Sequence, residues 1–465
     1  MSFWSGISDG FRRIKNWFTG FPEGAAKREF DVTQAISREA MQDINLWFSL
    51  YVGQAPWVTH DVISLNIPAA ICRELARPTL AELQVTIDGA AGEYLTEQFT
   101  TAQKRFEPAL ETFLALGGGA FKPYIFNGKI LVSYCGVNAF QPTRFDISGD
   151  CVGGVFKESI KSNGQYYVKL ESHEFENGRY IIRNRAFEST QSGSIWRPVS
   201  LNTVPEWADL QDETYIDGIE HPLFSYFRTP RANKLNPDSG VGVSMYADAV
   251  DLIRQADVQW ERLQWEYKSG ERRIFGERSQ VNIEQFGKDR LYAFGPFWSE
   301  NGDLLHEFSP EYRDSNVYAG FQSILKQIEF NVGLAFGTIS DPMSVDRTAT
   351  EVESTKQRMY ATIEGIKTNM QSALDGMIYA MSVMAGLYGL APAGDYTATF
   401  DWGDSILEDE TTKQLALADM RNDVAAGLIR PELYLMKKYN VSEEEALAMM
   451  PKMDTLVTEP ENEIE

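Results

Sequence analysis

Residues 243–270 read VSMYADAVDLIRQADVQWERLQWEYKSG. Apolar residues recur in this stretch at alternating steps of three and four over three heptads, and charged residues occupy the positions between them. This spacing predicts an amphipathic helix over 240–269 whose apolar stripe packs against another helix or a neighbouring copy. Gly270 interrupts the pattern and is expected to end the helix. The side chains expected to make the packing are Tyr246, Ile253, Trp260 and Tyr267.

A second helix is predicted over 311–336, where Val317, Phe321 and Ile328 continue a helical stripe. Between the two helices, residues 270–310 hold short strand-like runs such as Leu291-Tyr-Ala-Phe294. Two helices therefore flank a small β-containing insertion. The insertion gathers five basic residues, which are either a docking surface or ordinary solvated charge: Arg272, Arg273, Arg278, Lys288 and Arg290.

A polar loop is expected over 337–350, because Ser340, Asp341 and Pro342 oppose helix continuation. A very long helix and a strand are expected over 351–405. The end of this helix lies in an uncharged stretch, Gly376 to Gly394, which is long enough to raise the question of a membrane span. Its internal glycines, Pro392 and flanking aspartates favour the buried end of a core helix instead.

Residues 27–239 are expected to begin with helices and to change to antiparallel strands near residue 120. Asn127-Gly128, Asn163-Gly164 and Asn177-Gly178 each separate two strand-like runs. Because type I′ turns need positive φ at both central residues, the three pairs predict tight hairpins. Hairpins of this kind argue against a Rossmann sheet or a (β/α)₈ barrel. Gly117-Gly118-Gly119 is expected to end a helix, since no phosphate-binding loop pattern surrounds it.

The two ends of the chain have their own patterns. Residues 1–26 form an amphipathic arm in which Arg12, Arg13 and Lys15 accompany an apolar face. Such an arm would dock on its own protein or a neighbouring copy, or lie on a membrane surface, and the first is favoured. Short helices are expected over 406–453, with Pro431 at one start and a capping box at Ser442, followed by an acidic tail over 454–465. The fold class is therefore α+β.

Composition limits the chemistry of the chain. It has 465 residues with 43 Lys and Arg against 66 Asp and Glu, a formal net charge of -23. That balance excludes a protein that coats nucleic acid with a broadly basic surface. Three cysteines without a C-x-x-C pair and four scattered histidines predict no metal site, no disulfide framework and no cofactor. No catalytic motif is present, so we expect no enzyme, although a carboxylate pair for glycoside hydrolysis stays open. The N-terminus is not expected to be a secretory signal.

Several short segments follow one another in a particular order over residues 40–430. They are INLWFSLYVG (44–53), SLNIPAAICRELA (64–76), SGVGVS (239–244), GLAFGT (333–338), RTATEV (347–352), DWGDSILED (401–409) and AAGLIR (425–430). Their order and spacing resemble the portal (head–tail connector) proteins of tailed bacteriophages, of the long-tailed siphophage type. The resemblance implies a wing of helices and antiparallel β (27–239), two stem helices, a clip (270–310), a tunnel loop (337–350), a long wing helix and a helical crown (406–453).

The resemblance also implies a function and partners. A ring of usually twelve copies would sit at one capsid vertex of the virion, after assembly in the host bacterial cytoplasm, and form the channel for double-stranded DNA. The clip would dock the terminase large subunit and later the head–tail adaptor proteins, and the ring would contact the major capsid protein and scaffold, with no membrane partner. Another virion structural protein, such as a minor capsid component, is the alternative. The tunnel-loop residues expected to face DNA are Ser340, Asp341, Met343, Ser344, Val345, Asp346 and Arg347.

Overall fold

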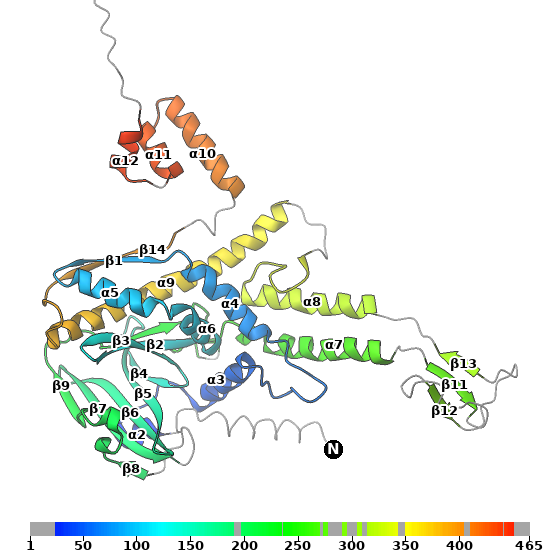
Figure 1. The fold of residues 1–465 in the computed structure, drawn as a ribbon, viewed down its shortest axis with the longest axis horizontal. Coiled ribbons are helices and arrows are strands. Elements are labelled where there is room, and N and C mark those ends of the chain that lie inside the picture. Colours follow the sequence, from blue (N-terminus) through cyan, green and yellow to red (C-terminus); the bar gives the residue numbers. More distant parts are fainter. Residues whose placement is uncertain are drawn as a thin grey trace, which may run out of the picture. The chain divides into compact units, whose positions relative to one another are not determined.

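The computed structural model describes residues 24–189, 197–234, 236–269, 273–277, 291–294, 305–308, 314–342, 349–403, 410–439 and 441–450. The chain forms two compact units, Met1–Trp402 and Gly403–Glu465. Within the described part the elements are α-helices and mostly antiparallel β-strands (Figure 1).

Five helices come before the main sheets: α2 (Ala25–Phe30), α3 (Arg38–Tyr51), α4 (Ile67–Leu80), α5 (Gly92–Gln103) and α6 (Phe106–Leu116). The hydroxyl of Ser37 caps α3 by accepting a hydrogen bond from the backbone N–H of Ala40 at 3.1 Å. Gly117, with φ of 89°, ends α6 in the left-handed region. The predicted role of Gly117 as a helix end is confirmed.

The β region holds two antiparallel sheets. One has the order β10-β2-β3, from β2 (Gly118–Phe126), β3 (Lys129–Gly136) and β10 (Ser225–Arg228). The other has the order β4-β5-β6-β7-β8, with β9 also paired to β7. Its strands are β4 (Phe140–Phe145), β5 (Cys151–Ser162), β6 (Gln165–Glu176), β7 (Arg179–Ser189), β8 (Arg197–Val199) and β9 (Glu213–Ile216).

All three predicted Asn-Gly hairpins are confirmed. They join β2 to β3, β5 to β6 and β6 to β7, and the residues flanking each pair face each other across the ladder. Asn127, Asn163 and Asn177 have φ of 51°, 52° and 52°, and the glycine after each also has positive φ. Only short polar residues and glycine reach this region readily, so the local sequence selects these turns.

A largely buried charge network joins the six-stranded sheet to strand β2 of the other sheet. The Glu171 carboxylate forms ion pairs with the ammonium groups of Lys122 and Lys169, at 2.8 and 3.1 Å. It also lies 2.8 Å from Nε2 of His173. The other ring nitrogen of His173 lies 2.8 Å from the hydroxyl of Tyr180. Burial alone would raise the pKa of Glu171, but the two lysines outweigh it and hold that pKa well below its usual range.

The sequence did not indicate strand β1 (Gln84–Gly89). It pairs antiparallel with β14 (Tyr396–Asp401), more than 300 residues later in the chain. No short turn connects β1 to β14. Local turn signals in the sequence therefore could not predict this two-stranded sheet.

Helix α7 (Val250–Ser269) ends where the sequence predicts but begins later than residue 240. A 3₁₀ turn, η3 (Ala247–Ala249), comes directly before it. The delay has a packing cause, since residues 240–246 run across the end of α6. A Cβ at Gly242 would collide with the carbonyl oxygen of Gly117, and Met245 N–H donates to the carbonyl of Leu114 at 3.0 Å.

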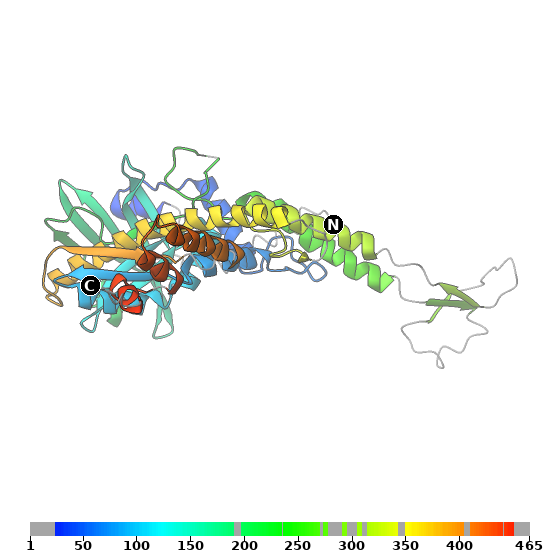
Figure 2. The same ribbon diagram turned by 90° about the horizontal axis from the view of Figure 1, so that it is seen from above.

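A small sheet follows α7 in the chain: β11 (Arg273–Glu277), β12 (Leu291–Phe294) and β13 (Leu305–Phe308). β12 pairs parallel to β11, and β13 pairs antiparallel to it. Helix α8 (Asp314–Val332) comes next. Both views of the ribbon show α7 and α8 side by side (Figures 1 and 2).

The long helix α9 (Ala349–Leu387) packs on β10 and β2. Met377, Ile378 and Met381 near its end have no exposed surface, so the first part of the uncharged stretch belongs to the core, as predicted. The later part does not, since Leu387 and Tyr388 are 54% and 64% exposed. No helix in the described part of the chain has the length and apolarity needed to cross a membrane.

The second unit contains α10 (Glu410–Ala425), α11 (Pro431–Tyr439) and α12 (Glu443–Met449). Pro431 begins α11, as predicted. The predicted capping box is also confirmed: Ser442 accepts from the N–H of Glu445 at 3.3 Å, and the Glu445 carboxylate accepts from the N–H of Ser442 at 3.1 Å.

Candidate functional site: the α7–α8 pair and the loop after α8

Helices α7 and α8 form an antiparallel pair with an apolar seam. The rings of Trp260 and Phe321 meet with centroids 5.6 Å apart, and the side-chain amide of Gln259 donates to the carbonyl of Val317 at 3.4 Å. Both helices also carry apolar side chains that are at most 6% exposed: Ile253, Ala256 and Leu263 of α7 and Phe321, Leu325, Ile328 and Val332 of α8. Within the same chain, α8 therefore covers Trp260 of the heptad stripe.

The four predicted packing residues lie in different surroundings. Tyr246 is fully buried before the 3₁₀ turn, and its hydroxyl donates to the carbonyl of Trp47 in α3 at 2.7 Å. Ile253 is buried, and Trp260 is half-buried against Phe321 of α8. Tyr267 is 44% exposed near the end of α7. The sequence pattern placed Tyr246 on the apolar stripe of the helix, but Tyr246 lies before the 3₁₀ turn and outside α7.

Aromatic side chains also remain exposed on the pair. Trp265 is 62% exposed and Tyr267 is 44% exposed on α7, while Tyr318 is 40% exposed and Phe330 is 50% exposed on α8. A contiguous patch of exposed apolar side chains marks an interaction surface, so these four are candidates for one.

Asp257 ties α7 to the segment that joins α3 to α4. Its carboxylate accepts from the indole N–H of Trp57 at 2.8 Å and from the backbone N–H of Leu65 at 2.9 Å. Only 1% of the residue is exposed. Burial raises the pKa of Asp257, although the two hydrogen bonds oppose that shift. In the sequence, the helical periodicity marks Asp257 only as a polar position of α7. Its role in binding Trp57 and Leu65 was therefore not predicted.

A second buried carboxylate, Glu329 in α8, organises the start of the loop. Glu329 has no exposed surface. Its carboxylate accepts from the backbone N–H groups of Gly337 (3.1 Å), Ile339 (2.7 Å) and Ser340 (2.9 Å). It also accepts from the Ser340 hydroxyl at 2.8 Å. Charge-assisted bonds to several donors compensate a buried carboxylate, so one side chain sets the path of residues 337–340.

The loop start has further supports on both sides. The backbone N–H of Asp341 donates to the side-chain oxygen of Gln322 at 2.7 Å. The hydroxyl of Thr362 in α9 lies 3.2 Å from the carbonyl of Gly333, where φ is 82°. The guanidinium of Arg358 in α9 stacks 4.6 Å from the ring centroid of Phe330. Helices α8 and α9 thus hold the beginning of their connection from both sides.

The predicted tunnel-loop residues divide into two groups. Ser340 is 5% exposed and hydrogen bonded to Glu329, and Asp341 is half-buried. The other five lie outside the described residues: Met343, Ser344, Val345, Asp346 and Arg347.

Of the predicted clip residues, only Arg273 falls on a described element, at the first position of β11. Arg272, Arg278, Lys288 and Arg290 lie outside the described residues. Among the described residues, no group of three or more His, Cys, Asp or Glu side chains is arranged to hold a metal ion.

No protein-family model matches the chain, and no curated protein matches it. The fold is similar to a chain in the solved structure of the virion of a native gene transfer agent (GTA) particle. That match has a TM-score of 0.43 and 10% identity, and it covers 93% of this chain and 98% of the other. A chain in the neck of a native GTA particle, computed with C12 symmetry, matches with a TM-score of 0.35 and 10% identity, covering 82% and 94%. These similarities are too distant to assign a function.

Proposed function

We propose that this chain is a portal-type subunit that assembles into a ring around a channel for double-stranded DNA. The sequence resemblance supports the family, and the order helix, small sheet, helix, loop, long helix supports the architecture. The observation that carries the proposal is the pair α7–α8, which closes an apolar seam within one chain and still exposes Trp265 and Tyr318. In a ring, neighbouring pairs would cover these side chains.

The charge of the chain suits a conduit. Each copy has a formal net charge of -23, so a ring of several copies carries that negative charge several times over. The resulting electrostatic field repels the phosphate groups of DNA. Duplex DNA would then slide through the channel under motor force without adhering to its wall. The terminase large subunit, the head–tail adaptor proteins, the major capsid protein and scaffold are the proposed partners, with the module of β11, β12 and β13 docking the first two.

The loop after α8 is proposed to narrow the channel. Its start is anchored by Glu329 and Gln322, which would let residues 341–347 present a constriction at a constant place. Asp341 and Asp346 would repel phosphate, Arg347 would contact it transiently, and Met343 and Val345 would brace adjacent loops. Ser340 then serves to hold the loop, because its hydroxyl is bonded to Glu329. Deleting residues 342–345 should leave rings intact and reduce retention of the full-length genome. If the deletion variant retains the genome as well as the wild type does, the loop does not restrict the channel, and this part of the proposal is wrong.

Ring formation is tested by electron microscopy and mass measurement of the purified chain. We expect rings with a central hole for the wild-type chain, and a Trp265→Glu variant that needs at least about tenfold higher concentration to assemble. Tyr388→Glu is the matched control, since Tyr388 is 64% exposed but lies beyond the end of α9. A wild-type chain that stays monomeric at micromolar concentration would overturn the proposal. Assembly with other virion proteins but not with itself would favour the minor capsid alternative.

A further inference from the structure

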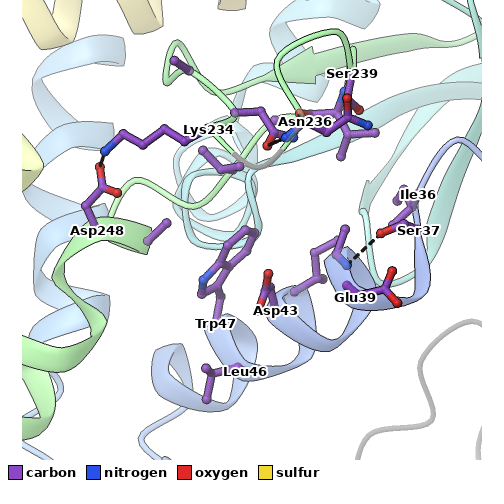
Figure 3. A pocket seen from close by; sticks show the side chains of 18 of the residues that line it. Ile36, Ser37, Glu39, Asp43, Leu46, Trp47, Lys234, Asn236, Ser239 and Asp248 are labelled. Atoms are coloured by element: carbon purple, nitrogen blue, oxygen red, sulfur yellow. Dashed lines mark hydrogen bonds and ion pairs between the residues drawn. The ribbon is translucent and has the colours of Figure 1, made fainter.

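A cavity of about 710 Å³ lies between α3 and residues 232–250. We call it the α3 pocket. Apolar side chains of Ile36, Ile44, Trp47, Val241 and Val243 contribute to its lining. Figure 3 shows Asp43 and Trp47 projecting from α3 toward the segment that carries Asn236 and Ser239. The pocket belongs neither to the α7–α8 seam nor to the loop after α8.

The acidic groups of the pocket exceed its cations. Of the four charged residues in its lining, Lys234 and Asp248 pair with each other at 2.8 Å, and Arg231 also binds Asp248 at 2.7 Å. Glu39 and Asp43 remain, and no ion pair of Asp43 occurs within the described residues. Asp43 is half-buried, and burial raises its pKa. A half-buried carboxylate beside an indole is suited to a cationic side chain flanked by apolar groups.

The chain itself contains a segment of the matching chemistry. Residues 1–23 carry Arg12, Arg13 and Lys15 against two acidic residues, whereas the whole chain has 66 acidic and 43 basic residues. The same segment holds six aromatic residues: Phe3, Trp4, Phe11, Trp17, Phe18 and Phe21. Its charge and its apolar content both complement the pocket.

The connection is long enough for this segment to reach the pocket of its own chain. Gly24 precedes α2, and Ala35 already lines the pocket. Six helical residues rise about 9 Å, and residues 31–35 span at most roughly 18 Å, so Gly24 lies within about 27 Å of Ala35. The eleven residues 13–23 span up to about 36–40 Å when extended. A short tether also gives the segment a high effective concentration at the pocket.

We infer that residues 1–23 bind in the α3 pocket of the same chain, with Arg12 or Arg13 pairing with Asp43 and an aromatic side chain packing beside Trp47. The bound segment would cover the apolar lining and neutralise the half-buried carboxylate. This inference does not depend on ring formation, so it can fail or succeed independently of the proposed function.

Disulfide trapping in the full-length chain tests the location. Lys15→Cys is combined either with Glu39→Cys, in the pocket lining, or with Gln42→Cys, which is on the same helix but outside that lining. Both α3 positions are exposed, so their thiols are matched in access. Lys15→Cys alone measures reaction with the natural Cys72, Cys135 and Cys151. We expect at least a fivefold higher yield of the disulfide within one chain at position 39. Equal yields at the two positions, or a disulfide joining two chains, would overturn the inference.

Trypsin cleavage after Arg12 and Arg13 tests the charge pairing. Asp43→Lys should speed cleavage about tenfold because it replaces the attracting carboxylate with a repelling ammonium. Gln42→Lys, the matched control one residue away, should leave the rate unchanged. Circular dichroism verifies that both variants are folded. Equal cleavage rates in the wild type and the two variants would contradict the pairing.

Discussion

Two carboxylates removed from solvent, the largely buried Glu171 in the six-stranded sheet and the fully buried Glu329 in α8, are compensated by different kinds of partner. Glu171 is compensated by the ammonium groups of Lys122 and Lys169 and by His173, all on strands of the β region. Glu329 is compensated by backbone N–H groups and one hydroxyl of the loop that follows its helix. The first arrangement balances charge between strands of the two sheets, whereas the second gives a loop its shape.

The largest expected effect is on the sheet. Glu171→Gln should lower the free energy of unfolding by about 3–5 kcal/mol, because it leaves Lys122 without its carboxylate and Lys169 with only the half-exposed Glu158, 3.0 Å away. Glu188→Gln is the control in the same sheet: Glu188 pairs with Arg197, which is 70% exposed, and its loss should cost about 0–1 kcal/mol. Chemical denaturation measures both variants. Equal losses would show that the network around Glu171 contributes no more than a surface pair.

A smaller loss is expected at the loop. Glu329→Gln keeps one acceptor oxygen but replaces the other with an amide, so at least one donor of residues 337–340 loses its partner. We expect a loss of about 1–3 kcal/mol and faster hydrogen exchange confined to these amides. Gln327→Ala, at an exposed position on the same helix, should change neither quantity. If hydrogen exchange at residues 337–340 stays slow in Glu329→Gln, the loop keeps its shape without the carboxylate. The contrast drawn between Glu171 and Glu329 would then be wrong.

The smallest expected effect is a pH dependence of stability that comes from the network around Glu171. Burial lowers the pKa of His173, although its hydrogen bond to Glu171 opposes this shift. The unfolded chain therefore binds more protons than the folded chain just below the ordinary histidine pKa of 6.5, so stability falls as the pH falls below 6.5. A further loss is expected below pH 4.5, where Glu171 takes up its proton on unfolding.

In the variant His173→Gln, the free energy of unfolding should depend less on pH between pH 6.5 and 4.5. The loss of stability below pH 4.5 should remain. Denaturation at a series of pH values in the wild type and the variant measures this difference. An unchanged slope between pH 6.5 and 4.5 in the variant would assign the titration to other groups.

Local patterns were sufficient for much of the fold. Positive φ at Asn127, Asn163 and Asn177 follows from residue type, because few other residues adopt that conformation at low cost. The end of α6 at Gly117 and the capping box at Ser442 also depend on residues next to one another. The burial of Met377 and Met381 followed from an apolar stripe that continued the register of α9.

Contacts between distant segments escaped the same reasoning. β1 pairs with β14 across most of the chain, and α7 begins late because residues 240–246 cross the end of α6. Asp257 and Glu329 lie on helices whose pattern marks them only as polar positions. Which donors each carboxylate receives depends on where other segments arrive in the folded chain.

The sequence by itself determined the hairpins, the helix ends and the apolar stripes, because these depend on backbone preferences and periodicity over a few residues. The tertiary structure alone decided that Tyr246 binds Trp47 and that Glu329 holds Ser340. It also decided that Asp43 lines a pocket. A buried polar group must find its partners somewhere, but the chain's path in space selects them, and no local pattern encodes that path.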